Sequence, residues 1–402
     1  MKNISTLLPK TVCHVSFNHD AFDDRIYWKE LIALKEAGYI AIHVCVGHHD
    51  RSFYTPEGIH IIEIKRKKNV GNIWVNRVLY FLKLKSSVIQ EVLLKCKTLK
   101  ADVYHYHDLQ LNGIVKALKS LPQKPKVIYD AHECYPLLLK ENSPSHKALK
   151  IGYSLIASLI AQWEIKSAKQ CDFLIATDEP TLRRFERNIP GVKSELLYNY
   201  SYFISPDEKQ VKPQKKYDFL YVGLISEARG IIDMLEAIAY LKEKFDPSAL
   251  IIGSFETPTI EKQVNEKIES LGLTNNVQLS NAVPFDKIKF FYEESSIGIG
   301  IFHPTPKYIN FIPIKLFEYM AFGLPVIFSD HGPSANIIKE VECGILVPPQ
   351  NSYAISTAMV ALTTNADLYN NLSKNGKRAV KEKYNWAIEK KKLLRIYSEL
   401  FI

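Results

Sequence analysis

Residues 313–330 read PIKLFEYMAFGLPVIFSD and predict a short helix, a tight turn and a buried strand. Pro313 suits the first helical position because the N–H that proline lacks has no helical partner there. Gly323 suits the position just after the helix, where φ is often positive. The apolar run at 326–328 is typical of a strand that is covered on both faces. This stretch therefore predicts one helix–strand unit of a parallel α/β sheet.

A single carboxylate, Glu318, lies in the middle of this otherwise apolar helix, and Lys315 adds a positive charge to the first turn. The free N–H groups and the dipole of a helix N-terminus favour an anion. A phosphate-bearing ligand with hydroxyl groups beside it would suit this pair. From the helix alone a second interpretation stays open, in which Glu318 is a solvated side chain weakly paired with Lys315.

Length and composition indicate a globular protein with two domains, because the chain has 402 residues, of which 47% are hydrophobic and 24% charged. No apolar run reaches the roughly 18 to 20 residues that span a bilayer. The first ten residues lack the apolar segment of a signal peptide. The six cysteines include no C-x-x-C pair, which indicates reduced thiols in a cytosolic protein, with neither a disulfide framework nor a zinc site.

The positive charge is distributed unevenly. The net charge is +9; residues 1–200 hold 29 Lys and Arg against 20 Asp and Glu, whereas residues 201–402 hold 23 of each. The excess in the first half indicates an anionic partner such as a membrane surface, a phosphorylated substrate or nucleic acid. Nucleic acid is less favoured because no recognition module is visible.

Strand-like and helix-like segments alternate along both halves. In the first half, strands are predicted at 11–17, 38–46, 59–65, 103–107, 127–129 and 173–177, and helices at 24–37, 72–99, 109–118, 144–168 and 179–185. After a linker-like stretch at 198–217, strands are predicted at 219–222, 249–252, 277–279, 297–302 and 344–347, and helices at 231–245, 259–271 and 285–294. The alternation predicts two doubly wound parallel sheets, in domains 1–200 and 201–380, with a ligand cleft between them at the carboxyl ends of the strands.

Two strand-to-helix turns of the second half contain glycine. Gly223 and Arg229 lie in YVGLISEARG (221–230), and Gly253 and Ser254 end the segment IIGS (251–254). Glycine lets the backbone approach a ligand closely, and the planar guanidinium of arginine suits phosphate oxygens. The alternative is that both segments are ordinary tight turns.

Polar side chains follow two predicted strands of the first half, in VYHYHDL (103–109) and VIYDAHE (127–133). They are His105, His107, Asp108, His132 and Glu133. Titratable side chains at strand ends suit a cleft better than a core. Because their spacing lacks the H-x-x-x-H or H-E-x-x-H pattern of a metal site, hydrogen bonds to a polyhydroxylated ligand fit them better.

Two further segments have alternative interpretations. In HDAFDDRI (19–26), Asp23 or Asp24 suits the N-cap of the next helix, and the segment also suits the floor of a pocket. Residues 146–169 combine lysines with an apolar stripe of Ile151, Leu155, Leu159 and Ile160. Such a helix either lies in an anionic membrane interface or turns its stripe to the core.

Together these segments resemble the retaining glycosyltransferases of group 1 (family 4), whose GT-B fold has two Rossmann-like domains facing a central cleft. The similar segments are FDDRIYWKELIALKEAGY (22–39), YHYHDLQLNG (104–113), VIYDAHE (127–133), YVGLISEARGI (221–231) and PIKLFEYMAFGLPVIFSD (313–330). The resemblance implies a hexosyltransferase that moves a sugar from a nucleotide-diphosphate sugar, such as a UDP- or GDP-sugar, to an acceptor with retention. No metal or other cofactor is expected. Residues 381–402 are expected to form a helix that packs back on the N-terminal domain.

The resemblance also assigns roles to residues. Glu318 would bind the ribose hydroxyls, Arg229 and Lys315 would bind the diphosphate, and His132 would donate a hydrogen bond to the sugar or the leaving phosphate. The candidate catalytic residues are therefore His132, Arg229 and Lys315. The donor-binding candidates are Gly223, Arg229, Gly253, Ser254, Asn310, Pro313, Ile314, Lys315, Leu316 and Glu318. The acceptor-side candidates are His19, Asp20, Asp24, Arg25, His107, Asp108 and Glu133.

Two positions depart from the family pattern. Asn310 stands where the first acid of an E-x7-E motif is expected, and Leu224 stands where the family has arginine. Two alternatives stay open: a nucleotide-sugar epimerase of the same architecture, and a non-catalytic nucleotide-sugar-binding protein.

The resemblance and the basic first half together predict a lipid-linked or polysaccharide-precursor acceptor, in the synthesis of a cell-envelope polysaccharide. The expected location is cytoplasmic, peripheral on the inner face of the plasma membrane.

Overall fold

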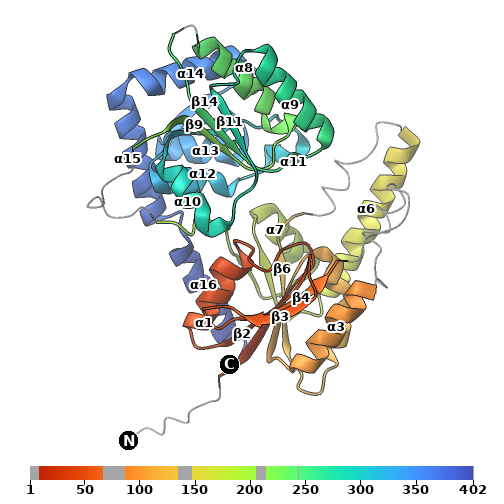
Figure 1. The fold of residues 1–402 in the computed structure, drawn as a ribbon. Helices are drawn as coiled ribbons and strands as arrows, with labels where there is room; N and C mark the ends of the chain where they lie inside the picture. Colours follow the sequence, from red (N-terminus) through yellow and green to blue (C-terminus); the bar gives the residue numbers. More distant parts are fainter. Residues whose placement is uncertain (1–8, 67–86, 135–146, 205–213, 243, 402) are drawn as a thin grey trace, which may run out of the picture. The chain divides into compact units, whose positions relative to one another are not determined.

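The computed structural model describes residues 9–66, 87–134, 147–204, 214–242 and 244–401, which form two compact units (Figure 1). The N-terminal unit comprises Met1–Asn199 and Glu389–Ile402, and the C-terminal unit comprises Tyr200–Ile388. Most of the last helix, α16 (Trp386–Glu399), therefore belongs to the N-terminal unit. Part of the predicted helix at 72–99 and part of the linker at 198–217 lie outside the described residues.

The N-terminal unit is built on an eight-stranded sheet of order β3-β4-β2-β1-β5-β6-β7-β8. All neighbouring strands are parallel except β3 and β4. The strands are β1 (Thr11–Ser16), β2 (Ile40–Gly47), β3 (Arg51–Tyr54), β4 (His60–Lys65), β5 (Val103–His107), β6 (Lys126–Ala131), β7 (Phe173–Ala176) and β8 (Ser194–Leu196). The edge strands β3 and β8 were not predicted, because they are short and carry no buried apolar run.

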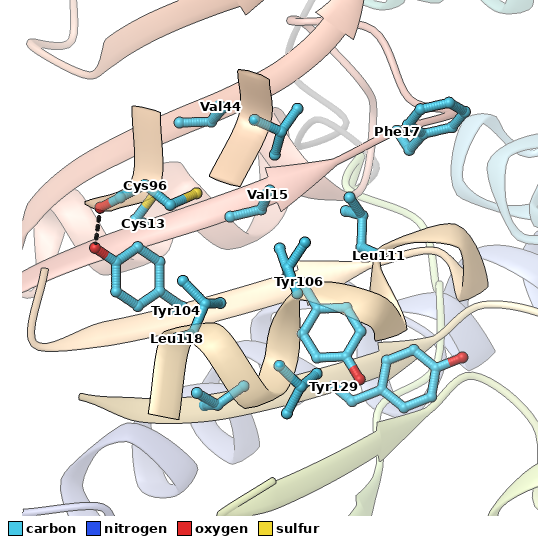
Figure 2. Close-up of a cluster of buried hydrophobic side chains, with 14 of the residues drawn as sticks. Cys13, Val15, Phe17, Val44, Cys96, Tyr104, Tyr106, Leu111, Leu118 and Tyr129 are labelled. Atoms are coloured by element: carbon cyan, nitrogen blue, oxygen red, sulfur yellow. Dashed lines mark hydrogen bonds between the residues drawn. The ribbon is translucent and has the colours of Figure 1, made fainter. Parts of the chain in front are cut away.

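The helices described for this unit cover the sheet, and the first of them begins as a π-helix. They are a π-helical turn Ile26–Leu31, α1 (Ile32–Glu36), α3 (Ser87–Leu99), a 3₁₀ turn Leu109–Ile114, α4 (Val115–Lys119), α6 (Lys147–Ala168) and α7 (Glu179–Asn188). The helix predicted at 24–37 is therefore present, but its first half is a π-helix instead of an α-helix. Figure 2 shows the core, in which Val15, Val44 and Tyr106 pack with Leu111 and Leu118.

The C-terminal unit has a six-stranded, wholly parallel sheet of order β11-β10-β9-β12-β13-β14. Its strands are β9 (Tyr217–Val222), β10 (Ala249–Ile252), β11 (Val277–Ser280), β12 (Ser295–Gly300), β13 (Val326–Ser329) and β14 (Gly344–Val347). Its helical segments are a 3₁₀ turn Glu227–Arg229, α8 (Ile231–Leu241), α9 (Pro258–Ser270), α10 (Phe285–Glu293), α11 (Pro306–Ile309), α12 (Ile314–Phe322), α13 (Gly332–Val341), α14 (Ser352–Thr364) and α15 (Ala366–Glu382). The two predicted parallel α/β sheets are therefore confirmed.

Helix α12 and strand β13 form the helix–strand unit predicted from residues 313–330. Gly323 ends the helix in the left-handed region, with φ of 70°, as its position predicts. Pro313 lies one residue earlier than predicted: it precedes the helix in an extended conformation, and Ile314 is the first helical residue.

Each sheet changes winding direction at its first strand. In the N-terminal unit β1 lies between β2 and β5, and in the C-terminal unit β9 lies between β10 and β12. The connections that leave the two central strands of a doubly wound sheet diverge, and ligands bind in the crevice where they part. The loops after β1 and β5, and those after β9 and β12, are therefore the places to look for a site.

We predict that Gly253→Ala destabilises the C-terminal unit. A Cβ at Gly253 would lie 1.7 Å from the carbonyl oxygen of Gly223, and overpacking of this kind lowers the free energy of unfolding by about 1–3 kcal/mol. Gly152→Ala is the matched control, since a Cβ there meets no atom within 4 Å and alanine favours α6. Calorimetry should show a lower transition for the first variant only; an unshifted transition would contradict the packing described.

Candidate active site

Arg229 follows strand β9 and is held by aromatic rings of the segment after β12. Its Nε donates to the hydroxyl of Tyr308, at 3.1 Å. Its guanidinium carbon lies 5.9 Å from the ring of Phe302, 5.5 Å from that of Tyr308 and 5.7 Å from that of Phe311. The backbone N–H of His303 donates to the carbonyl of Ala228, at 2.9 Å. Arg229 is therefore fixed at the point where the two central strands of the sheet part.

The positive charge of Arg229 has no counter-ion among the described residues. Within 9–66, 87–134, 147–204, 214–242 and 244–401, no carboxylate lies within ion-pair distance of it. The side chain is half-buried, and the faces of aromatic rings stabilise a cation without neutralising it. A guanidinium in this state can bind phosphate oxygens with its Nη groups.

The two glycine turns beside Arg229 pack directly on each other. Gly223 has φ of 151°, and a Cβ there would lie 3.1 Å from Nη1 of Arg229. Gly253 faces the carbonyl oxygen of Gly223, and the N–H of Ile225 donates to the carbonyl of Ser254 at 2.8 Å. Glycine at 253 is thus explained by packing, as in an ordinary tight turn, while Gly223 leaves the guanidinium room.

Glu318 is fully buried, at 0% exposure, so the interpretation of a solvated side chain is wrong. Its Oε2 accepts from the hydroxyl of Tyr292 and from Lys315 Nζ, the latter at 2.7 Å. Its Oε1 accepts no hydrogen bond from the described residues. Helix α12 reaches the end of β9 through Tyr319, whose hydroxyl accepts from the N–H of Val222 at 3.0 Å.

The other donor-side candidates occupy different environments. Leu316 and Pro313 are buried, Ile314 is half-buried, and Asn310 and Ser254 are exposed. Asn310 ends α11, next to the aromatic rings around Arg229.

In the N-terminal unit Asp108 joins the loops after β1 and β5. Its Oδ2 accepts from the N–H groups of Phe17 and Asn18, at 2.8 and 2.9 Å. His19 lies against it: its Nε2 is 3.5 Å from Oδ1 of Asp108, and its Nδ1 is 2.8 Å from Oδ2 of Asp23. The two loops that part at the winding change of this sheet are therefore joined by buried charges.

Opposite charges shift the pKa values of this cluster. Burial would lower the pKa of His19, but hydrogen bonds to Asp108 and Asp23 raise it to about 11. Burial would raise the pKa of Asp108, but His19 lowers it to about 2. His19 is therefore an imidazolium at neutral pH. Asp23 Oδ1 accepts from the N–H groups of Arg25 and Ile26 at the start of the following helix, although the N-cap residue of that helix is Arg25 and neither Asp23 nor Asp24 as predicted.

Arg25 is buried beneath this loop rather than open to a ligand. It forms a 2.7 Å ion pair with Asp130 of β6 and a 3.0 Å contact with Glu30. Burial would raise the pKa of Asp130, but the charge of Arg25 together with His132 and His105 keeps that pKa well below its usual range. The same burial raises the pKa of Glu30 well above its usual range.

His132 lies at the end of β6, and its side chain is 11% exposed. Its Nε2 is 3.0 Å from Nδ1 of His107, and its ring centroid lies 4.6 Å from that of His19. The structure thus brings His19, His107, Asp108 and His132 together. Three other acceptor-side candidates are not part of this group. Asp20 and Glu133 are exposed, and Asp24 lies 3.5 Å from Lys29.

Several polar residues of this cluster were not predicted as site residues. They are His14, Glu30 and Tyr397, all fully buried. His14 interrupts the apolar strand β1, which is the one local signal. Tyr397 comes from α16 and lies 383 residues from His14, whose Nε2 is 3.0 Å from its hydroxyl, so no local pattern could have found it.

The C-terminal unit matches the family model for glycosyl transferases group 1, over residues 205–379. An uncharacterized glycosyltransferase of Methanocaldococcus jannaschii is 22% identical over 311 residues, which are 74% of this chain and 75% of that protein. A phosphatidyl-myo-inositol mannosyltransferase of Mycobacterium leprae is 28% identical over 44% of this chain, which spans 45% of that protein. These matches support a group 1 glycosyltransferase. They do not favour the epimerase or the non-catalytic binding protein.

Solved structures show the fold of the whole chain. Sucrose-phosphate synthase of Thermosynechococcus elongatus superposes with a TM-score of 0.72 at 15% identity, over 98% of this chain and 99% of that one. HepE of Anabaena, solved with UDP and glucose, gives a TM-score of 0.66 at 12% identity, over 96% and 99%. These structures share the GT-B fold of two parallel-sheet α/β domains, so the predicted GT-B fold is confirmed. Among the described residues, no helix is both long and apolar enough to cross a membrane.

We predict that His19 stabilises the N-terminal unit in a pH-dependent way. Because its folded pKa of about 11 lies above the ordinary 6.5, its contribution is complete below about pH 6.5 and is lost as pH rises from there toward 11. The difference in free energy of unfolding between wild type and His19→Asn should therefore shrink between about pH 6 and pH 10. Urea unfolding followed by tryptophan fluorescence measures it, and His48→Asn, at an exposed loop position, is the control. A difference that grows with pH would contradict the assignment.

Proposed function

We propose that this protein is a retaining hexosyltransferase that moves a sugar from a nucleoside-diphosphate sugar to an acceptor. The observation that carries the proposal is the unpaired charge of Arg229, held at the winding change of the C-terminal sheet. The chain supplies no carboxylate to neutralise it among the described residues, so an anionic ligand is the natural partner. A diphosphate beside a nucleoside meets that requirement.

The proposed role of Arg229 is to stabilise charge as the diphosphate leaves. Negative charge develops on the diphosphate oxygens during transfer, and fixed positive groups aimed at that charge lower the barrier by several kcal/mol in comparable sites. Lys315 adds a second cation in the first turn of α12, but it is shared with Glu318 at 2.7 Å. Binding of the ribose hydroxyls by Glu318 would therefore use Oε1, which is buried and has no hydrogen-bond partner among the described residues, and would require this oxygen to become accessible.

Two further features of the donor side belong to this proposal. We expect a UDP- or GDP-sugar, with UDP tested first because the HepE structure contains UDP. We also expect transfer to need no metal, because Arg229 and Lys315 supply the positive charge that a cation would otherwise provide. We assign the acceptor side to the N-terminal unit, where the neighbouring groups His19, Asp108 and His132 suit hydroxyl groups.

A lipid-linked acceptor is supported by helix α6. Ile151, Leu155 and Leu159 are 64%, 63% and 65% exposed, whereas Ile160 is buried. The interpretation of a core-facing stripe is therefore wrong for the first three. An exposed apolar row on a basic helix fits an anionic membrane interface, and one relative is named for a phosphatidyl-myo-inositol acceptor. We propose peripheral attachment at the inner face of the plasma membrane, in cell-envelope polysaccharide synthesis.

We predict that the double variant Leu155→Glu/Leu159→Glu binds weakly to vesicles of phosphatidylglycerol and phosphatidylcholine, whereas wild type floats with them. Glutamate removes apolar area and adds repulsion from the anionic surface. Leu94→Glu is the matched control, because Leu94 is 61% exposed on α3 of the same unit. Equal flotation of wild type and the double variant would contradict the role of α6.

We predict that Arg229→Ala lowers kcat by roughly a hundredfold or more, as the loss of one preorganised charge does at comparable sites. The exposed Arg378, which donates a hydrogen bond to Asn375, gives the control variant Arg378→Ala. The assay is sugar release from a panel of UDP- and GDP-sugars with lipid-diphosphate acceptors, after a thermal-shift screen of the free nucleotides. Wild-type turnover in Arg229→Ala would contradict the phosphate role, and an epimerised donor without acceptor would indicate an epimerase.

A further inference from the structure

Buried rings in the N-terminal unit form one hydrogen-bonded chain that ends at His132. The hydroxyl of Tyr397, on α16, lies 3.0 Å from His14 Nε2. His14 Nδ1 lies 3.0 Å from His107 Nε2. His107 Nδ1 in turn lies 3.0 Å from His132 Nε2. Three links therefore connect the last helix of the chain to His132, the partly exposed ring at the end of this hydrogen-bonded chain.

The same cluster has the composition of a metal site but not its bonding. His14, Glu30, His105 and His107 place one ligand-type atom each within 4.8 Å of one another. His107, Asp130 and His132 form a second group of this kind. In the structure, however, His14 Nδ1 and His107 Nε2 lie 3.0 Å apart and are hydrogen-bonded to each other, so one of these two nitrogens carries a proton. Glu30 already has a cation beside it, since its Oε1 lies 3.0 Å from Nε of Arg25. We therefore interpret the cluster as a proton-ordered hydrogen-bond network.

The carboxylate of Asp130 decides which nitrogens carry the protons. Its Oδ2 lies 3.8 Å from His105 Nε2, 3.6 Å from His132 Nε2 and 3.7 Å from His107 Nδ1. Because Arg25 keeps Asp130 ionised, N–H groups facing this oxygen are favoured over lone pairs. If His105 and His132 both carry their proton on Nε2, two N–H groups and one lone pair, that of His107 Nδ1, face Asp130. In the opposite order, one N–H group and two lone pairs face it.

Glu30 Oε2 also faces these rings, 3.5 Å from His14 Nδ1, 4.0 Å from His105 Nδ1 and 3.8 Å from His107 Nε2, and as a carboxylate it would favour the opposite order. Asp130 outweighs Glu30 because Asp130 accepts two hydrogen bonds from Arg25, whereas neither oxygen of Glu30 accepts one from the described residues and burial raises the pKa of Glu30. The order with protons on both Nε2 atoms is therefore favoured.

The order then follows along the whole chain. With its proton on Nε2, His105 accepts at Nδ1 from the Tyr397 hydroxyl, 2.9 Å away. The Tyr397 oxygen accepts from His14 Nε2, His14 Nδ1 accepts from His107 Nε2, and His107 Nδ1 accepts from His132 Nε2. Burial lowers the pKa values of His14, His105 and His107, so these rings stay neutral and each has one donor and one acceptor.

We propose that this chain fixes the tautomer of His132, with the proton on Nε2 and a lone pair on Nδ1. Nδ1 has no hydrogen-bond partner among the described residues and is the nitrogen left for a ligand. A neutral His132 would then accept a hydrogen bond from a sugar or acceptor hydroxyl, rather than donate one to a phosphate. The catalytic consequence rests on the proposed glycosyltransferase function; His107, His14 and Tyr397 are positioning residues in it.

The tautomer can be measured without any substrate. The full chain labelled with ¹⁵N-histidine is examined by NMR, with His132→Asn used to assign the signal. In its neutral form, wild-type His132 should show a protonated Nε2 and an unprotonated Nδ1. In His107→Leu, which cannot hydrogen-bond, this preference should weaken toward a mixture. A wild-type proton on Nδ1, or an unchanged preference in His107→Leu, would overturn the proposal, as would one bound transition-metal ion per chain.

Turnover tests the consequence. His107→Leu should lower kcat roughly tenfold or more with little change in KM for the donor, since hydrogen-bonding groups positioned for proton transfer contribute about 10²–10⁴. His107→Asn should retain most of kcat, because its side-chain oxygen can still accept from His132. Tyr397→Phe should change the acidic limb of the pH profile of kcat, whereas the control Tyr106→Phe, whose hydroxyl bonds Asn112 at 2.7 Å, should not.

The outcomes separate the two proposals. Absence of transfer in wild type, with the expected tautomer in the NMR spectra, contradicts the proposed function and leaves the tautomer assignment standing. Equal activity of His107→Leu and His107→Asn in an active enzyme would overturn the positioning role.

Discussion

The winding change of a doubly wound parallel sheet is the constraint on which both halves of this chain depend. The loops after its two central strands must part, so side chains placed there are not needed to cover the sheet. In the N-terminal unit Asp108 binds the backbone of the loop after β1, and in the C-terminal unit Tyr308 binds Arg229. The same topology thus gathers an anion-rich cluster in one unit and a cationic position in the other.

The two positions differ in how their charges are balanced. In the N-terminal unit the charged groups compensate one another: Arg25 pairs with Asp130, and His19 lies between Asp23 and Asp108. Buried charges that are paired in this way hold a structure and orient neighbouring groups. In the C-terminal unit Arg229 has aromatic rings instead of a carboxylate. That difference supports the proposal that the C-terminal unit binds the anionic donor and that the N-terminal unit binds hydroxyl groups.

The sequence predicted the features that depend on residues close together in the chain. The β–α alternation, the glycine-ended helix α12 and the position of Arg229 after a strand all follow from spacing and residue type. The network around His132 could not be predicted, because a histidine within an apolar strand, such as His14, has no local sign of its partner. Tyr397 joins that network only because the last helix belongs to the N-terminal unit. The burial of Arg25 was likewise hidden, since it depends on Asp130, 105 residues later.

The central claim is that Arg229 receives the diphosphate of a nucleotide. A crystal structure of the protein with UDP or GDP tests it most directly, because it locates the phosphate oxygens. We expect these oxygens within about 3 Å of the Nη atoms of Arg229, with the ribose next to Oε1 of Glu318. A nucleotide bound elsewhere, or bound here with its phosphates turned away from Arg229, would contradict it.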